Sequence, residues 1–332
     1  MKEGKLPPEV LERLLTRTSR SSLLRVGART GEDAAVAAGW ETLVVTADPV
    51  TFTEENIGVY TVAVNANDVV ATGGRPMYLT TTVLLPPGIA ESRLEGLFEE
   101  IGDAARVAGL LWIGGHTEVT SAVTRIVVSG QCIGFLFGKP LLSSGARPGD
   151  TVCVTKWIAL EGTTTVARLR PQDSRRILGE RRHAEVIEWL TRPGISIVPE
   201  GRILEGQGLS SGHDPTEGGL AMGLAELAQR SGVGIRIRRE ELPVREETRL
   251  LCARFGLDPL GLLSSGVFLF TAPPEAARKA CRLVREAGIP ATAIGEVREG
   301  PAAVEIDDGK GGWDALPADA RDQIVKLTEA GG

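Results

Sequence analysis

Acidic side chains stand at places in the sequence where a purely apolar core would not accept them. Asp33 lies in GEDAAV between a glycine and a small apolar run, and Asp48 ends the β-branched run TLVVTAD. Asp68 follows Asn65 by three residues, so the two form a polar stripe on an otherwise apolar helical pattern. Mg²⁺ is usually held by a few carboxylates together with substrate phosphates. A fold that gathers these carboxylates could bind it, although Asp48 also suits a turn and Asp68 a helix surface.

The segment GGHTEVT places two glycines, a histidine and a glutamate directly after an apolar run that reads as a strand. Gly114 and Gly115 carry no side chain, so their backbone amides could approach a phosphate closely. His116 and Glu118 would then lie at the reacting end of the site. The alternative is a simple turn after a buried strand, with His116 as a structural hydrogen-bonding residue.

A second glycine-rich segment, SSGHDPTEGGLAMGL, runs straight into a helical pattern. Thr216 is a plausible N-cap, and Gly218 and Gly219 would form the first turn, whose exposed amides could bind an anion. Capping alone would explain Asp214 or Thr216 but not two adjacent glycines, each of which costs up to about 1 kcal/mol inside a helix. The glycines therefore indicate that something packs closely against this backbone.

The composition of the chain argues against several classes of protein and of binding partner. A net charge of −6 argues against nucleic acid or an anionic membrane as the main partner, because such proteins usually carry a basic excess. The sequence shows no secretory h-region and no apolar run of about 18 residues. Four widely separated cysteines favour buried thiols in a reducing cytoplasm. Phosphate-loop, dinucleotide, nucleophile-elbow and zinc-protease motifs are absent, so any nucleotide is bound by another architecture.

The order of expected elements favours an α+β fold with two domains. Helical periodicity covers 54–72 and 91–110, and strand-like runs cover 77–87 and 124–138. The stretch 138–150 is rich in Gly, Pro and Ser and lies between two apolar strand-like runs, which makes it the predicted linker. We therefore expect an N-terminal domain at 1–140 and a C-terminal domain at 150–332.

Five motifs occur in the order found in the aminoimidazole-ribonucleotide synthetase (PurM-like) superfamily: GEDAA, TADPVTF, VNANDVVATGGRP, GGHTEVT and HDPTEGGL. The chain resembles this superfamily over nearly its whole length, most closely its HypE-like hydrogenase-maturation branch and related proteins. Signature segments of selenophosphate synthetase, thiamine-phosphate kinase and aminoimidazole-ribonucleotide synthetase itself are not matched.

The resemblance implies a fold and a site. It implies an N-terminal domain that pairs across a homodimer into a β-barrel, a C-terminal α+β sandwich, and ATP bound with Mg²⁺. The metal ligands would be Asp33, Asp48 and Asp68. From the residues themselves we expect nucleotide binding by Gly114, Gly115, Asn67, Lys156, Thr216, Gly218 and Gly219, where Lys156 could instead be a solvated lysine. The candidate catalytic residues are His116, Glu118 and Asp214, and His116 is expected to hydrogen-bond phosphate or substrate, since neutral imidazole is a poor Mg²⁺ ligand.

One departure separates the chain from the usual HypE chemistry. HypE carries its carbamoyl group on a C-terminal cysteine, whereas the last cysteine here is Cys281, 51 residues before the end of the sequence. We therefore expect an ATP- and Mg²⁺-dependent enzyme that phosphorylates or dehydrates an unidentified small substrate bearing a carbonyl, amide or phosphate group. The alternative is a non-catalytic nucleotide-binding accessory or scaffold protein, with a partner protein in metallocentre assembly.

Overall fold

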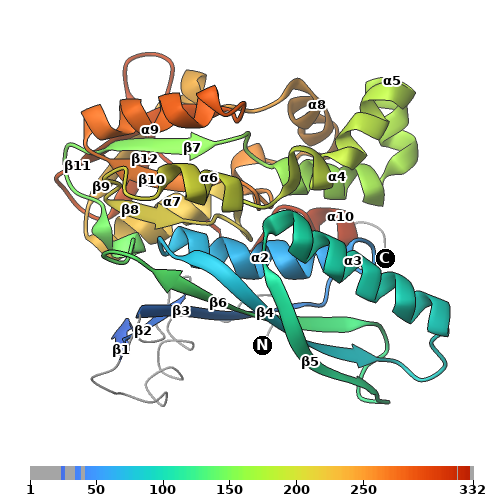
Figure 1. Cartoon of the computed structure of the whole chain (residues 1–332). Helices are drawn as coiled ribbons and strands as arrows, with labels where there is room; N and C mark the ends of the chain where they lie inside the picture. Colours follow the sequence, from blue (N-terminus) through green and yellow to red (C-terminus); the bar gives the residue numbers. More distant parts are fainter. Residues whose placement is uncertain (1–23, 27–33, 39–41, 320, 330–332) are drawn as a thin grey trace.

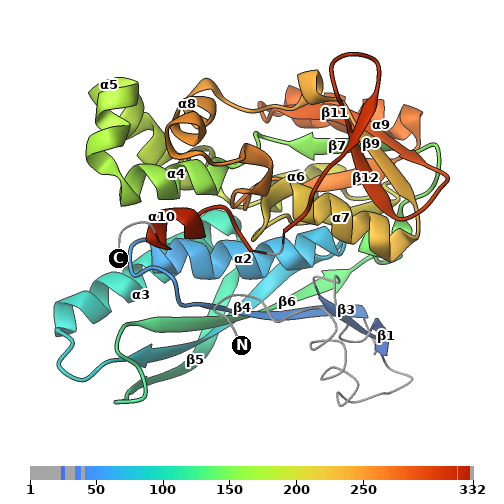
Figure 2. The same cartoon turned by 180° about the vertical axis from the view of Figure 1, so that it is seen from behind.

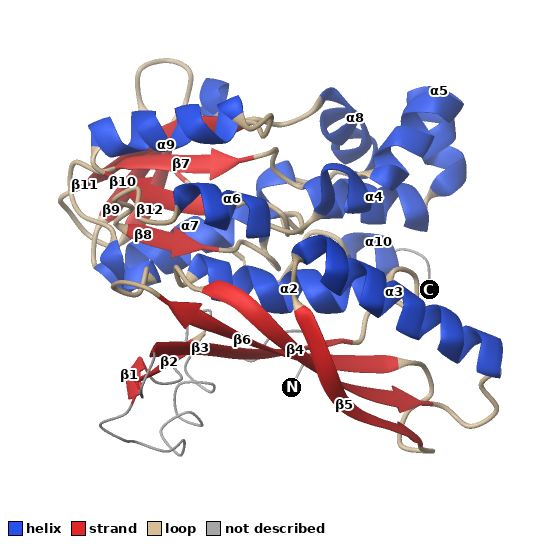
Figure 3. Ribbon diagram, viewed as in Figure 1, coloured by secondary structure: helices blue, strands red, loops and turns tan. Residues whose placement is uncertain are grey.

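The computed structural model describes residues 24–26, 34–38, 42–319 and 321–329, and it shows a two-domain α+β fold. Each half contains one sheet, and Figures 1 and 3 show helix α2 lying between the first sheet and the second half of the chain. The α+β class expected from the sequence is confirmed. Within the described ranges, no helix combines the length and the apolar composition needed to cross a lipid bilayer.

The first sheet has the strand order β1-β2-β3-β6-β4-β5. All neighbouring pairs are antiparallel except β4 and β5, which are parallel. Its strands are β1 (Leu24–Val26), β2 (Ala35–Ala38), β3 (Thr42–Val50), β4 (Arg75–Leu85), β5 (Leu111–Val119) and β6 (Val127–Leu136).

Two helices cover one face of this sheet (Figure 3). Helix α2 (Ile57–Ala71) is buried on nearly every side, as its almost wholly apolar and small-residue sequence requires. Helix α3 (Glu91–Ala108) is amphipathic and buries only four residues; it ends at Gly109, whose φ of 72° is the left-handed conformation that favours glycine at this position. Both helices and the Gly109 stop agree with the sequence pattern.

The second sheet has the order β13-β12-β9-β11-β7-β10-β8 and is mixed, because β12 and β9 are parallel and the other pairs antiparallel. Its strands are β7 (Thr151–Thr155), β8 (Ser211–His213), β9 (Gly234–Ile237), β10 (Leu269–Ala272), β11 (Ala291–Arg298), β12 (Ala303–Asp307) and β13 (Trp313–Ala315). Figures 1 and 2 show α9 above this sheet and α7 below it.

The helices of the second half fill the space around its sheet and against α2. They are α4 (Leu160–Leu169), α5 (Pro171–Glu188), α6 (Val198–Leu204), α7 (Gly219–Ser231), α8 (Glu246–Phe255), α9 (Pro274–Glu286) and α10 (Val325–Glu329). Short helical turns are η1 (Ser143–Gly145), η2 (Leu190–Gly194), η3 (Arg239–Glu241) and η4 (Pro259–Gly261). Helix α6 lies directly on α2: a Cβ added to Gly201 would stand 2.5 Å from Cγ1 of Val70.

Candidate functional site

Two of the predicted metal ligands lie at one corner, where strand β3 passes beneath helix α2. The Thr46 hydroxyl donates a 2.6 Å hydrogen bond to Oδ2 of Asp68 on α2. Two residues further along β3, the backbone amide of Asp48 donates to Oδ1 of Asn65 at 3.0 Å, and Nδ2 of Asn65 donates back to the Asp48 carbonyl at 3.2 Å. Both carboxylates are partly exposed. The structure therefore brings Asp48 and Asp68 together, and we call this place the β3–α2 corner.

Glycines in strand β6 allow α2 to lie this close to the sheet. A Cβ at Gly130, the register partner of Asp48, would stand 2.4 Å from Nδ2 of Asn65. A Cβ at Gly134 would stand 2.4 Å from Cγ1 of Val69. Burial, reinforced by the charge of Asp68, raises the pKa of the Cys132 thiol to about 12. Cys132 is thus a buried neutral thiol beside the corner.

The donor set of the β3–α2 corner suits a hard divalent cation. Asp48 and Asp68 offer carboxylate oxygens, the ligand type that Mg²⁺ prefers. Asp33, the third predicted ligand, lies outside the described residues. In the part of the chain that the structure does describe, no three His, Cys, Asp or Glu side chains form a metal-binding group.

His116 and Glu118 lie on the other face of the first sheet. The register row that contains Asp48 runs through Gly130, Thr81 and Gly115, and it faces α2. His116 pairs with Thr82 in the next row, whose side chains point to the opposite face because strand side chains alternate. His116 and Glu118 are both exposed there, with 3.4 Å between Nε2 and Oε2. Within one chain they do not meet the β3–α2 corner.

The sequence interpretation of the glycine pair as the end of a strand was wrong. Strand β5 continues through Gly114 and Gly115 to Val119, because β4 goes on pairing with it after a bulge at Ile113. A Cβ at Gly115 would stand 1.8 Å from the Thr81 carbonyl oxygen, so glycine is needed there for strand contact. Gly114 has open space around its Cα instead.

Lys156 is buried and takes part in an ion pair, which excludes the solvated alternative. It follows β7, is 2% exposed, and its ammonium donates to Oε1 of Glu200 at 2.5 Å. It also donates to the carbonyls of Ser196 at 2.8 Å and Gly266 at 3.0 Å. Three acceptors therefore already surround the charge proposed for phosphate neutralisation.

Asn67 joins α2 to the second half of the chain. Its Nδ2 donates to the Ile195 carbonyl at 2.9 Å, and its Oδ1 accepts from the Ile197 amide at 2.8 Å. The side chain is fully buried. Asn67 and Asp68 are neighbours on α2, but Asn67 faces the second half and Asp68 faces β3.

The N-cap residue of α7 is not the one expected from the sequence. The expected N-cap, Thr216, was wrong: Gly218 occupies that position with a φ of 77°, and Thr216 contributes its carbonyl to the amide of Gly219. The close packing inferred from the glycines is present, since a Cβ at Gly219 would stand 2.6 Å from the Leu260 and Leu262 carbonyl oxygens.

A carboxylate from the C-terminal segment occupies this helix start. Oδ2 of Asp322 accepts from the Gly218 amide at 3.0 Å, and its Oδ1 accepts from the Ile324 amide at 2.8 Å. Figure 2 shows the segment leading to α10 running between α7 and α2. A phosphate could reach the Gly218 amide only if Asp322 moved away.

Asp214 is buried directly after β8, near the C-terminal half of α2. A Cβ at Gly212 in β8 would stand 2.5 Å from the Ala71 carbonyl oxygen at the end of α2. The preceding residue, His213, lies 2.8 Å from Glu226 between Nε2 and Oε2. Of the three candidate catalytic residues, Asp214 alone is on the same side of the first sheet as α2.

Sequence reasoning missed an acidic cluster formed by Glu161, Glu217 and Asp322, in which Glu161 and Asp322 are buried and Glu217 is half-buried. Burial, with the charges of Asp322 and Glu217, raises the pKa of Glu161 to about 7, against the effect of its hydrogen bonds to Ser265. Burial and Glu217 also raise the pKa of Asp322 to about 6. Glu161 could be read from the sequence only as an acid in the first turn of a helix, and Asp322 has no local signal, because its partner Gly218 is 104 residues away.

Comparison with known proteins places this arrangement in a family. The model of the AIR synthase related protein N-terminal domain matches residues 31–136, and that of the corresponding C-terminal domain matches residues 147–308. Carbamoyl dehydratase HypE of Azotobacter vinelandii is 30% identical over 240 residues, which cover 71% of this chain and 67% of that protein. Thiamine-monophosphate kinase of Methanopyrus kandleri is 32% identical over 251 residues, covering 74% of each.

The fold agrees with these sequence matches. A crystal structure of the hydrogenase maturation protein HypE in complex with ATP superposes with a TM-score of 0.69 at 24% identity, covering 96% of this chain and 91% of that one. The superfamily and the two-domain PurM-like architecture expected from the five motifs are therefore confirmed, and the relatives indicate an ATP-dependent enzyme of that superfamily. The chain belongs to the AIR synthase related family.

Proposed function

We propose that this protein is an ATP- and Mg²⁺-dependent enzyme that phosphorylates or dehydrates a small substrate at a carbonyl, amide or phosphate group. The observation that carries the proposal is the β3–α2 corner, where Thr46 and Asn65 hold Asp68 and Asp48 on adjoining elements. The relatives include a carbamoyl dehydratase and a phosphate-transferring kinase, and a solved structure with this fold holds ATP. Both reactions share one step, in which an oxygen atom of the substrate attacks the γ-phosphorus of ATP and ADP leaves. In a dehydration the phosphorylated oxygen then departs as inorganic phosphate.

The proposed roles follow from where each residue lies. Asp48 and Asp68, with Asp33, would hold Mg²⁺, which when bound neutralises charge on the phosphates. Asp214 would face the substrate from the second half. Gly218 and Gly219 would contact phosphate after Asp322 withdraws. Asn67 and Lys156 would not contact the nucleotide directly. They would hold the site in place, because each bonds two segments of the chain that flank it.

We further propose that the enzyme is a homodimer that pairs through the first sheet into a barrel. The face opposite α2 and the edge strand β5 expose apolar side chains: Val45 39%, Leu111 59%, Ile113 58% and Val119 60%. An exposed apolar edge is a site for pairing with another chain. The proposed roles of His116, Glu118 and Gly114 belong to this dimer, because within one chain these residues are remote from the β3–α2 corner. The four buried cysteine thiols support the cytoplasm as its compartment.

A second candidate function is nucleotide binding without turnover, in an accessory protein for metallocentre assembly. The contact between Asp322 and Gly218 favours it, because the resident carboxylate keeps phosphate from one predicted cradle. Both functions predict ATP binding, so only turnover separates them.

The test is ATP binding measured by calorimetry with and without Mg²⁺, followed by phosphate release across a panel of carboxylates, amides, carbamoyl compounds and alkyl phosphates. We expect Mg²⁺-dependent binding that Asp48→Asn weakens at least tenfold. Asp314→Asn is the matched control, because Asp314 is an exposed aspartate on the distant strand β13. Equal binding by Asp48→Asn and the control would refute the metal assignment, and binding without phosphate release over the whole panel would favour the accessory function.

The dimer is tested separately by light scattering on the purified chain. Ile113→Lys places a charge on the exposed bulge of β5 and is expected to give monomers. Leu250→Lys is the control, since Leu250 is an exposed leucine on α8, far from the first sheet. A monomeric wild-type protein would contradict the proposed pairing.

A further inference from the structure

A cavity of about 410 Å³ opens where the end of β6 and the start of β4 meet α6. Its walls are largely apolar and come from both halves of the chain, including Val70, Leu136, Leu204 and Phe268. Small-molecule sites are typically concave, mostly apolar and placed between domains, with a few polar groups that fix the ligand. Neither Asp48 nor Asp68 lines this cavity.

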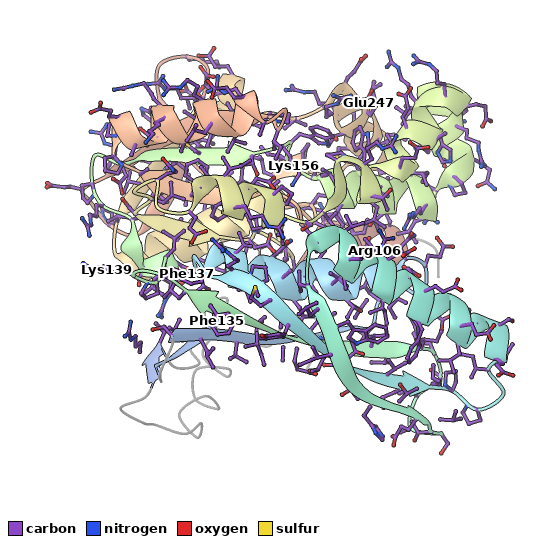
Figure 4. The ribbon with its side chains drawn as sticks, in the orientation of Figure 1. Arg106, Phe135, Phe137, Lys139, Lys156 and Glu247 are labelled. Atoms are coloured by element: carbon purple, nitrogen blue, oxygen red, sulfur yellow. The ribbon has the colours of Figure 1, made fainter. Side chains whose placement is uncertain are left out.

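Cationic side chains stand at its mouth. Lys139 is exposed, and in the described part of the chain its ammonium has no acidic partner. Arg75 lies over the ring of Phe137 at 4.9 Å and is paired with Glu205 at 2.7 Å. Figure 4 shows Phe137 and Lys139 close together where β6 ends beside the second half. The charge of Lys139 is therefore available to an anion, next to an aromatic ring that is 69% exposed.

A buried acceptor without a donor lies in the same wall. Oε1 of Gln207 is shielded from solvent and has no hydrogen-bond partner among the described residues. Its Nε2 makes only a long contact, 3.5 Å, to the Glu205 carbonyl. Gly206 and Gly208, with φ of 71° and 76°, hold Gln207 in a turn that other residues rarely adopt. An unsatisfied buried acceptor costs free energy. Gln207 lines the cavity, and rotation of its amide toward the cavity would let a ligand donate to Oε1.

We propose that this cavity binds a small organic acid that has an apolar body and an N–H or O–H donor. The anionic group would pair with Lys139, the apolar body would lie against Phe137 and Leu136, and the donor would satisfy Gln207. This site is separate from the β3–α2 corner, and its occupancy does not require ATP.

The probe for this site is 8-anilinonaphthalene-1-sulfonate, which combines a sulfonate, two apolar ring systems and an anilino N–H. Fluorescence titration of the full chain is expected to show saturable binding that Lys139→Gln weakens about tenfold, the usual size for loss of one charged hydrogen bond. Lys279→Gln is the matched control, because Lys279 is exposed on α9 and outside the cavity. Dye bound outside the cavity gives a background common to all variants.

Gln207→Leu tests the donor separately from the charge. It is expected to weaken binding of the anilino dye several-fold. The affinity for 1-naphthalenesulfonate, which lacks the N–H, should stay unchanged. Its melting temperature should equal or exceed that of the wild type, because the substitution removes an unpaired buried acceptor. Equal titrations by the wild type, Lys139→Gln, Gln207→Leu and Lys279→Gln would overturn the proposal. Displacement of the dye by ATP with Mg²⁺ would also overturn it, because the cavity would then belong to the nucleotide site.

Discussion

The ammonium of Lys156 and the carboxylate of Glu200 form a fully buried ion pair, 2.5 Å between Nζ and Oε1, beneath the contact of α2 with the second half. Because the remaining ammonium hydrogens go to the carbonyls of Ser196 and Gly266, the lysine fastens the segment before α6 to the strand β7. Asn67 on α2 forms two hydrogen bonds with the backbone of this same segment, at Ile195 and Ile197.

We predict that Lys156→Met lowers the free energy of unfolding by roughly 3–5 kcal/mol, since it leaves Glu200 charged and unpaired in the core. The double variant Lys156→Met/Glu200→Leu should regain most of that loss. Urea denaturation measures both. If Lys156→Met were as stable as the wild type but failed to bind ATP, the lysine would have the phosphate role predicted from the sequence instead.

Thr46→Val should weaken Mg²⁺-dependent ATP binding about tenfold and lower the free energy of unfolding by no more than roughly 1.5–3 kcal/mol. Valine keeps the shape of threonine but removes the hydroxyl that orients Asp68, and a hydrogen bond to a charged group is worth about 1.5–3 kcal/mol. Calorimetric titration of ATP is the measurement. Thr80→Val is the control, since the Thr80 hydroxyl donates to Gln131 on the face away from α2. Equal ATP affinities for the two variants would show that Asp68 does not contact the nucleotide complex.

Glu161 should make stability depend on pH between about 4.5 and 7. Burial raises its folded pKa, so in this range the folded state holds a proton that the unfolded state has released. The free energy of unfolding therefore falls as pH rises through the range, by up to roughly 3 kcal/mol, and Asp322 adds a fall in the same direction.

Glu161→Gln is expected to remove most of this slope and to raise stability at pH 8 relative to the wild type. Denaturation curves at pH 4.5, 6 and 8 test it. Glu299→Gln, an exposed loop substitution, should reproduce the wild-type slope. A slope unchanged in Glu161→Gln would mean that Glu161 is charged throughout.

Asp322→Asn should strengthen binding of inorganic pyrophosphate about tenfold. The substitution removes the negative charge that now accepts from the Gly218 amide, so the neutral side chain that remains competes less strongly with an incoming phosphate and no longer repels it. Isothermal titration with pyrophosphate gives the affinity, and Asp308→Asn, at an exposed turn, is the comparison. If affinity does not rise, the start of α7 is not a phosphate site.

The sequence predicted the elements whose signals are local. Periodicity over 54–72 gave α2, and Gly109 correctly marked the end of α3. The strand predicted from the sequence ended before Gly114, whereas β5 continues to Val119. It continues because it pairs with β4, some thirty-five residues earlier in the chain, and that pairing leaves no local signal. The same limit applies to side chains. Asp68 contacts Thr46 on β3, the strand that carries Asp48, but their role as metal ligands stays a prediction. The burial of Lys156 depends on Glu200, and that of Asp322 on Gly218.

Asn67 and Asp68 are consecutive residues of helix α2. The Asn67 side chain hydrogen-bonds the second half of the chain, and the Asp68 carboxylate accepts a hydrogen bond from Thr46 on β3. A movement of the second half that turns α2 would therefore also move Asp68, because Asn67 and Asp68 belong to the same helix. If Asp68 binds the cation as proposed, opening of the two halves for substrate exchange would rotate this carboxylate and couple release of product to release of the cation.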